Sequence, residues 1–187
     1  LKEAILQSFK QAVGTMNKKE VTFPAVKGRF RDGTFRCGFE AYEELINYLD
    51  RERDYSNLDI DALKIIGAWG ACHEAGCEDS KRHDIADYLL YVAFYDSNGE
   101  RANIERAAQL YRGVECLFDN LLIIHPSTTS WGRQGNGHLP SLASEDSALR
   151  EEAVKSFGRD MKEAVKIVRK IRAKEKEAIE ELKKVIG

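Results

Sequence analysis

Apolar side chains recur every three or four residues along most of this chain, which is the spacing of one face of an α-helix. The most regular run lies near the C-terminus, where only Glu175 interrupts an otherwise apolar or small seam. A helix over 144–186 would be roughly 60 Å long at about 1.5 Å per residue, so we expect it to make contacts beyond one compact domain. The seam consists of Val154, Phe157, Met161, Ala164, Val168, Ile171, Glu175, Ala178, Leu182 and Val185.

The same spacing predicts several helices before this tail. Ser144 is the expected N-cap of the tail helix, because a serine can accept hydrogen bonds from the first free backbone amides. Gly14 is the expected end of the first helix, since glycine readily takes the left-handed conformation that terminates helices. The helix near residue 80 is expected to bury Ile85, Leu89, Val92 and Ala93. The predicted helices cover about 1–13, 39–49, 60–72, 80–93 and 104–121.

The period changes between residues 21 and 38, where a β-hairpin is predicted. Asp32-Gly33 is a favoured two-residue hairpin turn. With this turn, Phe30 pairs with Phe35 and Arg29 opposes Arg36. Alternation then gives one apolar face and one basic face, in which like charges oppose each other. The basic face holds Lys27, Arg29, Arg31 and Arg36, and the apolar face holds Val26, Phe30, Phe35, Cys37 and Phe39.

These elements predict an all-α fold: a bundle of about five or six helices, one N-terminal β-hairpin and a long C-terminal amphipathic helix. We expect a helical domain over 1–143 and a bundle or coiled-coil helix over 144–187. The Ser/Thr/Gly-rich connection over 126–143 is longer than most links between helices, which is typical of loops that are functional or disordered. Self-association is expected along the tail seam, through Val168, Ile171, Ala178, Leu182 and Val185.

Composition narrows the class of protein. The chain has 187 residues, of which 43% are hydrophobic and 32% charged, as in folded proteins that are not embedded in a membrane. No apolar run reaches the roughly 18 residues of a membrane span. The chain begins with Leu1 rather than Met, which is compatible with a trimmed or processed piece of a longer protein. The four cysteines lie in or beside apolar stretches, which favours buried, reduced thiols and a cytoplasmic location.

Charge is unevenly distributed although the net charge is only -2. Residues 1–37 carry eight Lys or Arg against three Asp or Glu, whereas residues 38–100 carry five against fifteen. Basic residues also follow the tail helix from Arg159 to Lys176. Such segregation favours binding to phosphates or to a neighbouring copy. The simpler interpretation is a solvated charged face, because the whole protein is mildly acidic.

The most site-like cluster is the segment that contains Cys72, His73, Cys77 and His83, because thiolate and imidazole are the ligands that zinc prefers. The spacing is not that of a standard zinc motif, so core cysteines and surface histidines are the simpler interpretation. Gly132 to Gly137 is glycine-rich but lacks the Gly-Lys-Ser/Thr of a phosphate loop. No catalytic triad or nucleophile elbow is present in the sequence.

These patterns lead to one hypothesis with two alternatives. We expect a non-enzymatic structural or assembly protein that forms a homo-oligomer, needs no cofactor, and binds RNA or DNA backbone through Lys27, Arg29, Arg31 and Arg36. Nucleocapsid or coat subunits work in this way. The first alternative is a metal-dependent enzyme or zinc-stabilised module at Cys72, His73, Cys77 and His83. The second is a helical adaptor that binds other proteins.

Overall fold

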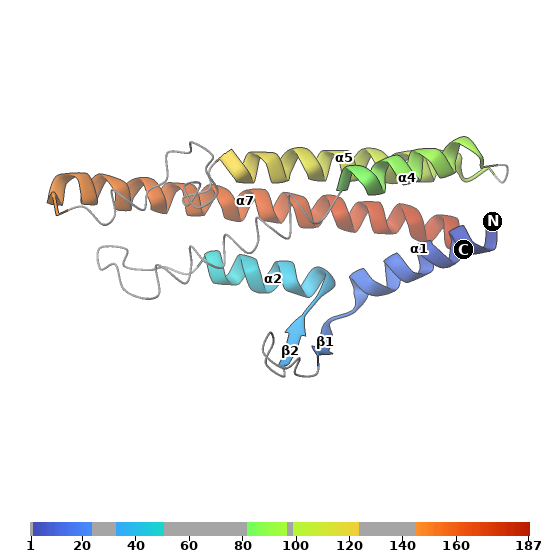
Figure 1. The fold of residues 1–187 in the computed structure, drawn as a ribbon, viewed down its shortest axis with the longest axis horizontal. Coiled ribbons are helices and arrows are strands. Elements are labelled where there is room, and N and C mark those ends of the chain that lie inside the picture. Colours follow the sequence, from blue (N-terminus) through green and yellow to red (C-terminus); the bar gives the residue numbers. More distant parts are fainter. Residues whose placement is uncertain (1, 24–32, 51–81, 97–98, 124–144) are drawn as a thin grey trace. The chain divides into compact units, whose positions relative to one another are not determined.

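The computed structural model describes residues 2–23, 33–50, 82–96, 99–123 and 145–187. In this part of the chain it contains five α-helices and one two-stranded antiparallel sheet (Figure 1), which confirms the predicted fold class. The helix predicted over 60–72 and the connection over 126–143 lie outside the described residues. The elements are α1 (Lys2–Asn17), β1 (Glu20–Phe23), β2 (Gly33–Arg36), α2 (Gly38–Leu49), α4 (Arg82–Phe94), α5 (Arg101–Ile123) and α7 (Ser147–Ile186).

The chain forms two compact units, and each is assembled from separated segments. The first contains residues 1–47, 82–114 and 169–187, and the second contains residues 48–81 and 115–168. Both α5 and α7 therefore contribute one part to each unit. The domain boundary predicted near residue 143 stays a prediction.

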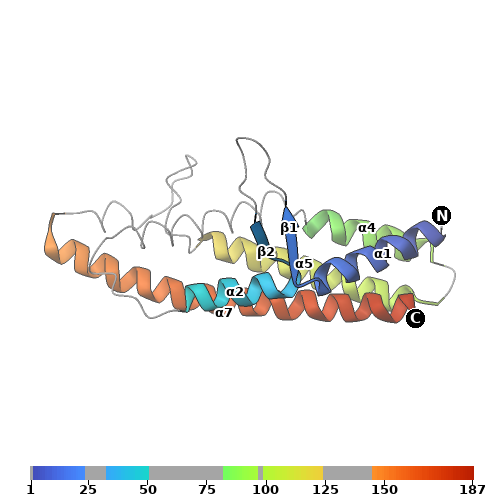
Figure 2. The ribbon, with the colours of Figure 1, turned by 90° about the horizontal axis from the view of Figure 1, so that it is seen from below.

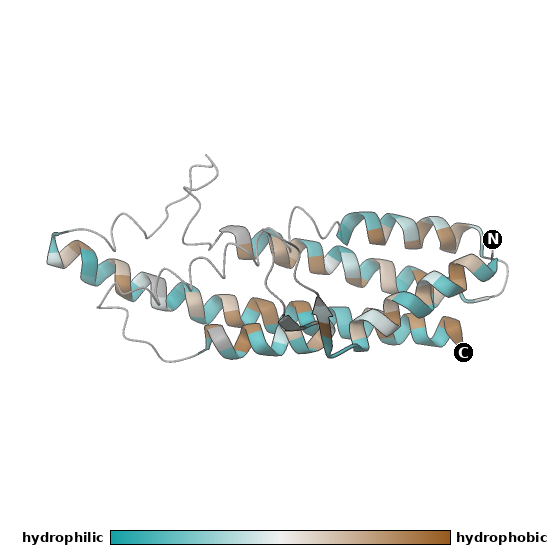
Figure 3. Ribbon diagram, turned by 60° about the horizontal axis from the view of Figure 1, so that its bottom comes forward, coloured by the Kyte–Doolittle hydropathy of each residue, from teal (hydrophilic) through white to brown (hydrophobic). Residues whose placement is uncertain are grey.

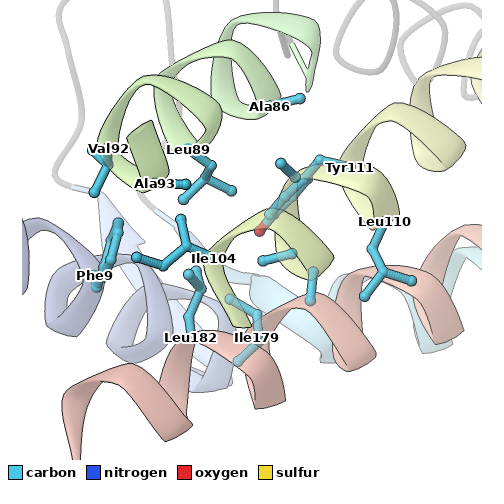
Figure 4. Close-up of a cluster of buried hydrophobic side chains, with 13 residues drawn as sticks. Phe9, Ala86, Leu89, Val92, Ala93, Ile104, Leu110, Tyr111, Ile179 and Leu182 are labelled. Atoms are coloured by element: carbon cyan, nitrogen blue, oxygen red, sulfur yellow. The ribbon is translucent and has the colours of Figure 1, made fainter. Parts of the chain in front are cut away.

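The core of the first unit lies where α1, α4, α5 and α7 meet, as Figure 4 shows. Phe9 is the one fully buried residue of α1 and is 2% exposed. It belongs to the same cluster as Leu89 of α4, Ile104 of α5 and Ile179 of α7. Helix α4 and the first part of α5 run side by side in opposite directions (Figures 1 and 2). A short connection at Gly99, with φ of 86°, joins them.

Helix α7 confirms the predicted seam. Its buried and partly buried positions keep the three-four rhythm from Met161 to Val185, and Figure 3 shows the alternation of hydrophobic and hydrophilic positions along it. The helix is 40 residues long. Its N-cap is Asp146, whose Oδ1 accepts hydrogen bonds from the amides of Ala148 at 2.9 Å and Leu149 at 3.3 Å. The expected cap, Ser144, lies outside the described residues.

The hairpin is present, but the predicted register is wrong. Phe35 pairs with Val21, and Arg36 pairs with Glu20. Figure 2 shows this short sheet between the end of α1 and the start of α2. The observed register sets β-branched and aromatic residues opposite each other and gives Arg36 an acidic partner, whereas the predicted one opposed two arginines. Gly33 pairs with Phe23, so Asp32-Gly33 is not a two-residue turn.

Three smaller predictions are also corrected. Helix α1 continues through Gly14 to Asn17, and Met16 in this added turn packs against the core cluster. Ile85 is 36% exposed rather than buried with Leu89. Cys116 is an exposed free thiol, because it faces away from the apolar stripe of α5.

Gly38 is required where the chain enters α2. Its φ is 55°, a left-handed conformation that residues with a Cβ rarely adopt. A Cβ at this position would overlap the backbone carbonyl of Met16 and lie 2.9 Å from the carbonyl oxygen of Lys18. The close approach of α1 to the start of α2 therefore depends on the missing side chain.

We predict that Gly38→Ala lowers the free energy of unfolding by about 1–3 kcal/mol, because backbone strain is added to a steric overlap. The matched control is Gly14→Ala in α1, where a Cβ would meet nothing within 4 Å. That control should stabilise the protein by about 0.5–1 kcal/mol. Urea unfolding followed by circular dichroism measures both. Equal effects of the two substitutions would contradict the role of Gly38.

Candidate functional site

The most unusual buried group is the carboxylate of Glu175, which lies in the apolar seam of α7 and is 1% exposed. Its Oε1 accepts a hydrogen bond from Nε of Arg82 at 2.8 Å and lies 2.8 Å from Nη2 of the same guanidinium. Arg82 is the first residue of α4 and its side chain is 20% exposed. The pair therefore connects α4 to α7. Removing one partner would leave a buried charge uncompensated.

Two tyrosines surround this ion pair. Nη2 of Arg82 donates a hydrogen bond of 3.4 Å to the hydroxyl of Tyr42 in α2. Burial, together with the negative charge of Glu175, raises the pKa of Tyr42 well above its usual value. The same two causes raise the pKa of Tyr111 in α5 to about 12. Both hydroxyls therefore stay protonated at neutral pH.

A second ion pair connects α7 with α2 one turn earlier. Arg172 pairs through Nη2 with Glu43, and its own Nε is buried without a hydrogen-bond partner among the described residues. Oε2 of Glu175 is likewise buried and without a partner there. These two unsatisfied atoms make the cluster sensitive to any change in packing. We interpret the cluster as a structural device that fixes the positions of α2, α4 and α7, because its carboxylate is closed to solvent.

The opposite side of α7 is strongly basic. Eight residues between Ala153 and Lys176 are exposed among those whose exposure the structure describes. Seven of them are Lys or Arg and none is acidic. They follow one another at helical spacing, so they share the side of the helix that faces away from the buried seam. We call these seven residues the basic face of α7: Lys155, Arg159, Lys162, Lys166, Arg169, Lys170 and Lys176.

Part of the basic face is neutralised by neighbouring acids. Nζ of Lys155 lies 2.8 Å from Oε1 of Glu151, and Nζ of Lys166 lies 2.9 Å from Oε2 of Glu163. Lys162, Lys170 and Lys176 have no acidic partner within 4 Å among the residues that the structure describes. A row of exposed ammonium groups is suited to a polyanion that presents charges at repeated intervals.

The basic hairpin residues are only partly described. Lys27, Arg29 and Arg31 lie outside the described ranges. Arg36 is about half exposed, pairs with Glu20 across the sheet and lies 3.9 Å from Glu44. The assignment of these four residues to nucleic-acid binding stays a prediction. Nearby acids already offset the positive charge of Arg36, which was expected to face other arginines.

Of the four zinc candidates, the described residues include His83. Cys72, His73 and Cys77 lie outside the described ranges. His83 is half exposed at the start of α4, with its Nε2 3.1 Å from Asp84. Within the ranges that are described, no group of three or more His, Cys, Asp or Glu side chains is arranged to hold a metal ion. The zinc site therefore stays a prediction.

The residues expected to mediate self-association are already packed within one chain. Val168, Ile171, Ala178 and Leu182 are each at most 2% exposed. Val185 packs against the core cluster of the first unit. Their role in an oligomer stays a prediction, but a partner could reach them only if the helices separated. An interface with another chain requires apolar residues that are exposed in the folded protein.

A surface with such residues lies on α4, which is apolar on two sides. Its inner side is buried through Ala86, Leu89 and Ala93. Its outer side carries three aromatic rings that are more than 60% exposed. Sequence reasoning missed them, because apolar residues on two sides of a helix weaken its period. We call the outer set the aromatic face of α4: Tyr88, Leu90, Tyr91, Phe94 and Tyr95.

The rings of the aromatic face contact one another. The centroids of Tyr91 and Tyr95 are 4.9 Å apart, and those of Phe94 and Tyr95 are 5.0 Å apart in an edge-to-face arrangement. The hydroxyl of Tyr88 lies 3.2 Å from Oγ of Ser8 in α1. Exposed apolar groups gathered in this way mark an interaction surface more often than isolated ones do.

Comparisons with known proteins identify no relative. No protein-family model, curated protein or solved structure matches the chain. Among the described helices, none combines the length and the apolar character that a membrane crossing requires.

We predict that Glu175→Leu lowers the free energy of unfolding by about 3–5 kcal/mol, because the guanidinium of Arg82 loses its carboxylate partner. The double variant Arg82→Met with Glu175→Leu should recover most of this loss, since no charge is left unpaired. Glu177→Leu, at a neighbouring exposed position of α7, is the control and should change stability by less than about 1 kcal/mol. Urea unfolding provides the three values. A double variant as unstable as the single one would show that the two residues are not coupled.

We also predict a loss of stability in alkaline solution. Tyr111 ionises near pH 10 in the unfolded chain but only at about 12 in the folded protein, so its contribution is complete below pH 10 and disappears as the pH rises toward 12. The contribution is about 2–3 kcal/mol for a shift of this size. As the pH rises from 9 to about 11, the free energy of unfolding should therefore fall less in Tyr111→Phe than in the parent. Identical pH dependence in the two proteins would contradict the raised pKa.

Proposed function

We propose that this protein is a non-enzymatic assembly protein that self-associates and binds the backbone of a nucleic acid along the basic face of α7. One observation carries the proposal. Seven of the eight exposed positions described between Ala153 and Lys176 are basic, although the chain as a whole has a net charge of -2. Phosphate groups are the natural partners of such a row of cations.

The geometry of a helix supports contact with several phosphates at once. Lys155 and Lys176 are 21 positions apart along α7, which corresponds to roughly 30 Å. Their flexible side chains suit a backbone of regularly spaced charges better than one small anion. The exposed rings of the described part lie on α4, where Asp84 and Asp87 are also exposed, so a base-stacking platform is not supported. We therefore expect binding that depends on salt and little on sequence.

The aromatic face of α4 favours a second candidate function, the helical adaptor that binds other proteins. The two functions differ in their dependence on phosphate. An adaptor would bind a protein partner with the basic face neutralised, whereas an assembly protein of the kind proposed here requires that face.

We predict that the triple variant Lys162→Gln, Lys170→Gln and Lys176→Gln weakens binding to labelled RNA and DNA oligonucleotides of unrelated sequence. The slope of the logarithm of the association constant against the logarithm of the salt concentration should become shallower by about 2–3, since up to three phosphate contacts are lost. Fluorescence anisotropy at several salt concentrations measures both quantities.

The matched control removes the same charge elsewhere, in the triple variant Lys10→Gln, Lys183→Gln and Lys184→Gln. Lys183 and Lys184 already pair with Glu180 and Glu181, so this control should bind like the parent. A further variant with Arg29, Arg31 and Arg36 changed to Gln tests the hairpin in the same assay. Absence of binding by the parent, or equal weakening by the first variant and the control, would overturn the assignment to α7.

A further inference from the structure

The aromatic face of α4 is too large to be explained as scattered surface residues. Its five side chains are between 40% and 69% exposed. Taking about 200 Å² for each side chain, they present roughly 550 Å² of mostly apolar surface, near the upper end for the largest patch of a monomer. All five come from the last two turns of α4 and the residue that follows.

We propose that this surface is where two copies of the chain pair, with the two α4 helices crossing antiparallel about a two-fold axis near Tyr91. The inference rests on the self-association in the proposed function and names the residues that mediate it. A two-fold axis places the same patch of each copy against the other, which is the commonest symmetry of protein oligomers. Aromatic rings suit such a contact because they pack edge to face with their own kind.

The area agrees with what a weak but specific dimer needs. Covering roughly 550 Å² on each copy removes roughly 1,100 Å² in total, which just exceeds the approximately 1,000 Å² expected of a biological interface. The chain offers no better apolar surface among the described residues, because the seam of α7 is buried. Among the described residues, the other exposed large apolar side chains are Ile85, which is 36% exposed, and Leu149, which belongs to the second unit.

Charge selects the antiparallel crossing. The first half of α4 carries the exposed acids Asp84 and Asp87, whereas the second half carries the rings. Asp84 lies seven residues before Tyr91, or about 10 Å along the helix. A two-fold axis through Tyr91 and perpendicular to α4 therefore separates the two Asp84 residues by roughly 20 Å, about two Debye lengths at physiological salt. A parallel pairing would place the carboxylates of Asp84 and Asp87 beside the same carboxylates of the other copy, where they would repel each other.

The contact surface is also partly preorganised. Tyr91, Phe94 and Tyr95 already contact one another, and the hydroxyl of Tyr88 is within hydrogen-bond distance of Ser8. Pairing therefore immobilises few additional side chains, which lowers the entropic cost of association. Asp87 is held by Arg112 of α5, so its charge is partly neutralised beside the rings.

Sedimentation velocity of the full chain over roughly 1–100 µM tests the proposal, because an interface of this size gives a moderate affinity. The parent should dimerise, and the double variant Tyr91→Ser with Phe94→Ser should be monomeric with unchanged helicity. Leu149→Ser removes another exposed large apolar side chain, 57% exposed, and should dimerise like the parent. A monomeric parent overturns the proposal and indicates that another segment or partner covers the face. A dimer in all three proteins overturns the assignment to α4 while leaving self-association intact.

Oxidative cross-linking gives a second, independent measurement. Because residues next to a two-fold axis meet their own counterparts, Tyr91→Cys should form a disulfide between identical peptides of two chains, whereas Leu149→Cys should not. Mass spectrometry distinguishes this disulfide from those of the native cysteines. Absence of a disulfide between the two substituted α4 peptides contradicts the crossing. Nucleic-acid binding by the monomeric double variant should persist, so failure of pairing is distinguishable from failure of the basic face.

Discussion

The ion pair between Arg82 and Glu175 is the interaction on which the first unit depends. The seam of α7 is apolar except for one carboxylate, and that carboxylate is almost completely buried. A buried charge without a partner is costly, so α4 has to place its first residue beside it. Tyr42 brings α2 to the same place through its hydrogen bond with Arg82. The network favours the observed axial positions of these helices, because sliding would separate the buried carboxylate from its guanidinium partner.

The buried seam also decides which surfaces of the protein are available for partners. The regular stripe of α7 resembles a coiled-coil seam, but in this structure its residues are buried within the chain. Among the described residues, the basic side of α7 and the aromatic side of α4 are exposed. The first is suited to phosphates, and the second is suited to an apolar partner. The two properties lie on different helices, so binding and pairing can be separated by substitution.

Periodicity was sufficient to predict the long helices. In α5 the apolar positions that follow the three-four rhythm are all buried, because such a rhythm marks one face of a helix; they are Ile104, Ala107, Tyr111, Val114, Phe118 and Leu121. The hairpin register could not be predicted in this way. Asp32-Gly33 is a strong turn signal, but the pairing of Val21 with Phe35 and Glu20 with Arg36 outweighs it. The residues of a turn motif do not determine which residues of the two strands pair with each other.

The candidate site was less predictable for a similar reason. Glu175 stood out in the sequence as the polar member of an apolar seam, but any of 29 Lys or Arg residues could have been its partner. Only the tertiary arrangement selects Arg82, which is 93 residues away. The basic residues of α7 were visible as a cluster in the sequence, whereas the structure was needed to show which of them pair with acids, such as Lys155 with Glu151 and Lys166 with Glu163.

Lysine footprinting tests the central claim most directly. An amine-reactive reagent, with mass spectrometry of the modified peptides, reports which ammonium groups are accessible with and without a single-stranded oligonucleotide. The account predicts that Lys162, Lys170 and Lys176 react in the free protein and are protected by the oligonucleotide, while Lys10 and Lys184 react equally in both. Protection that is absent, or that is as strong at Lys10 as at Lys170, would contradict the proposed binding face.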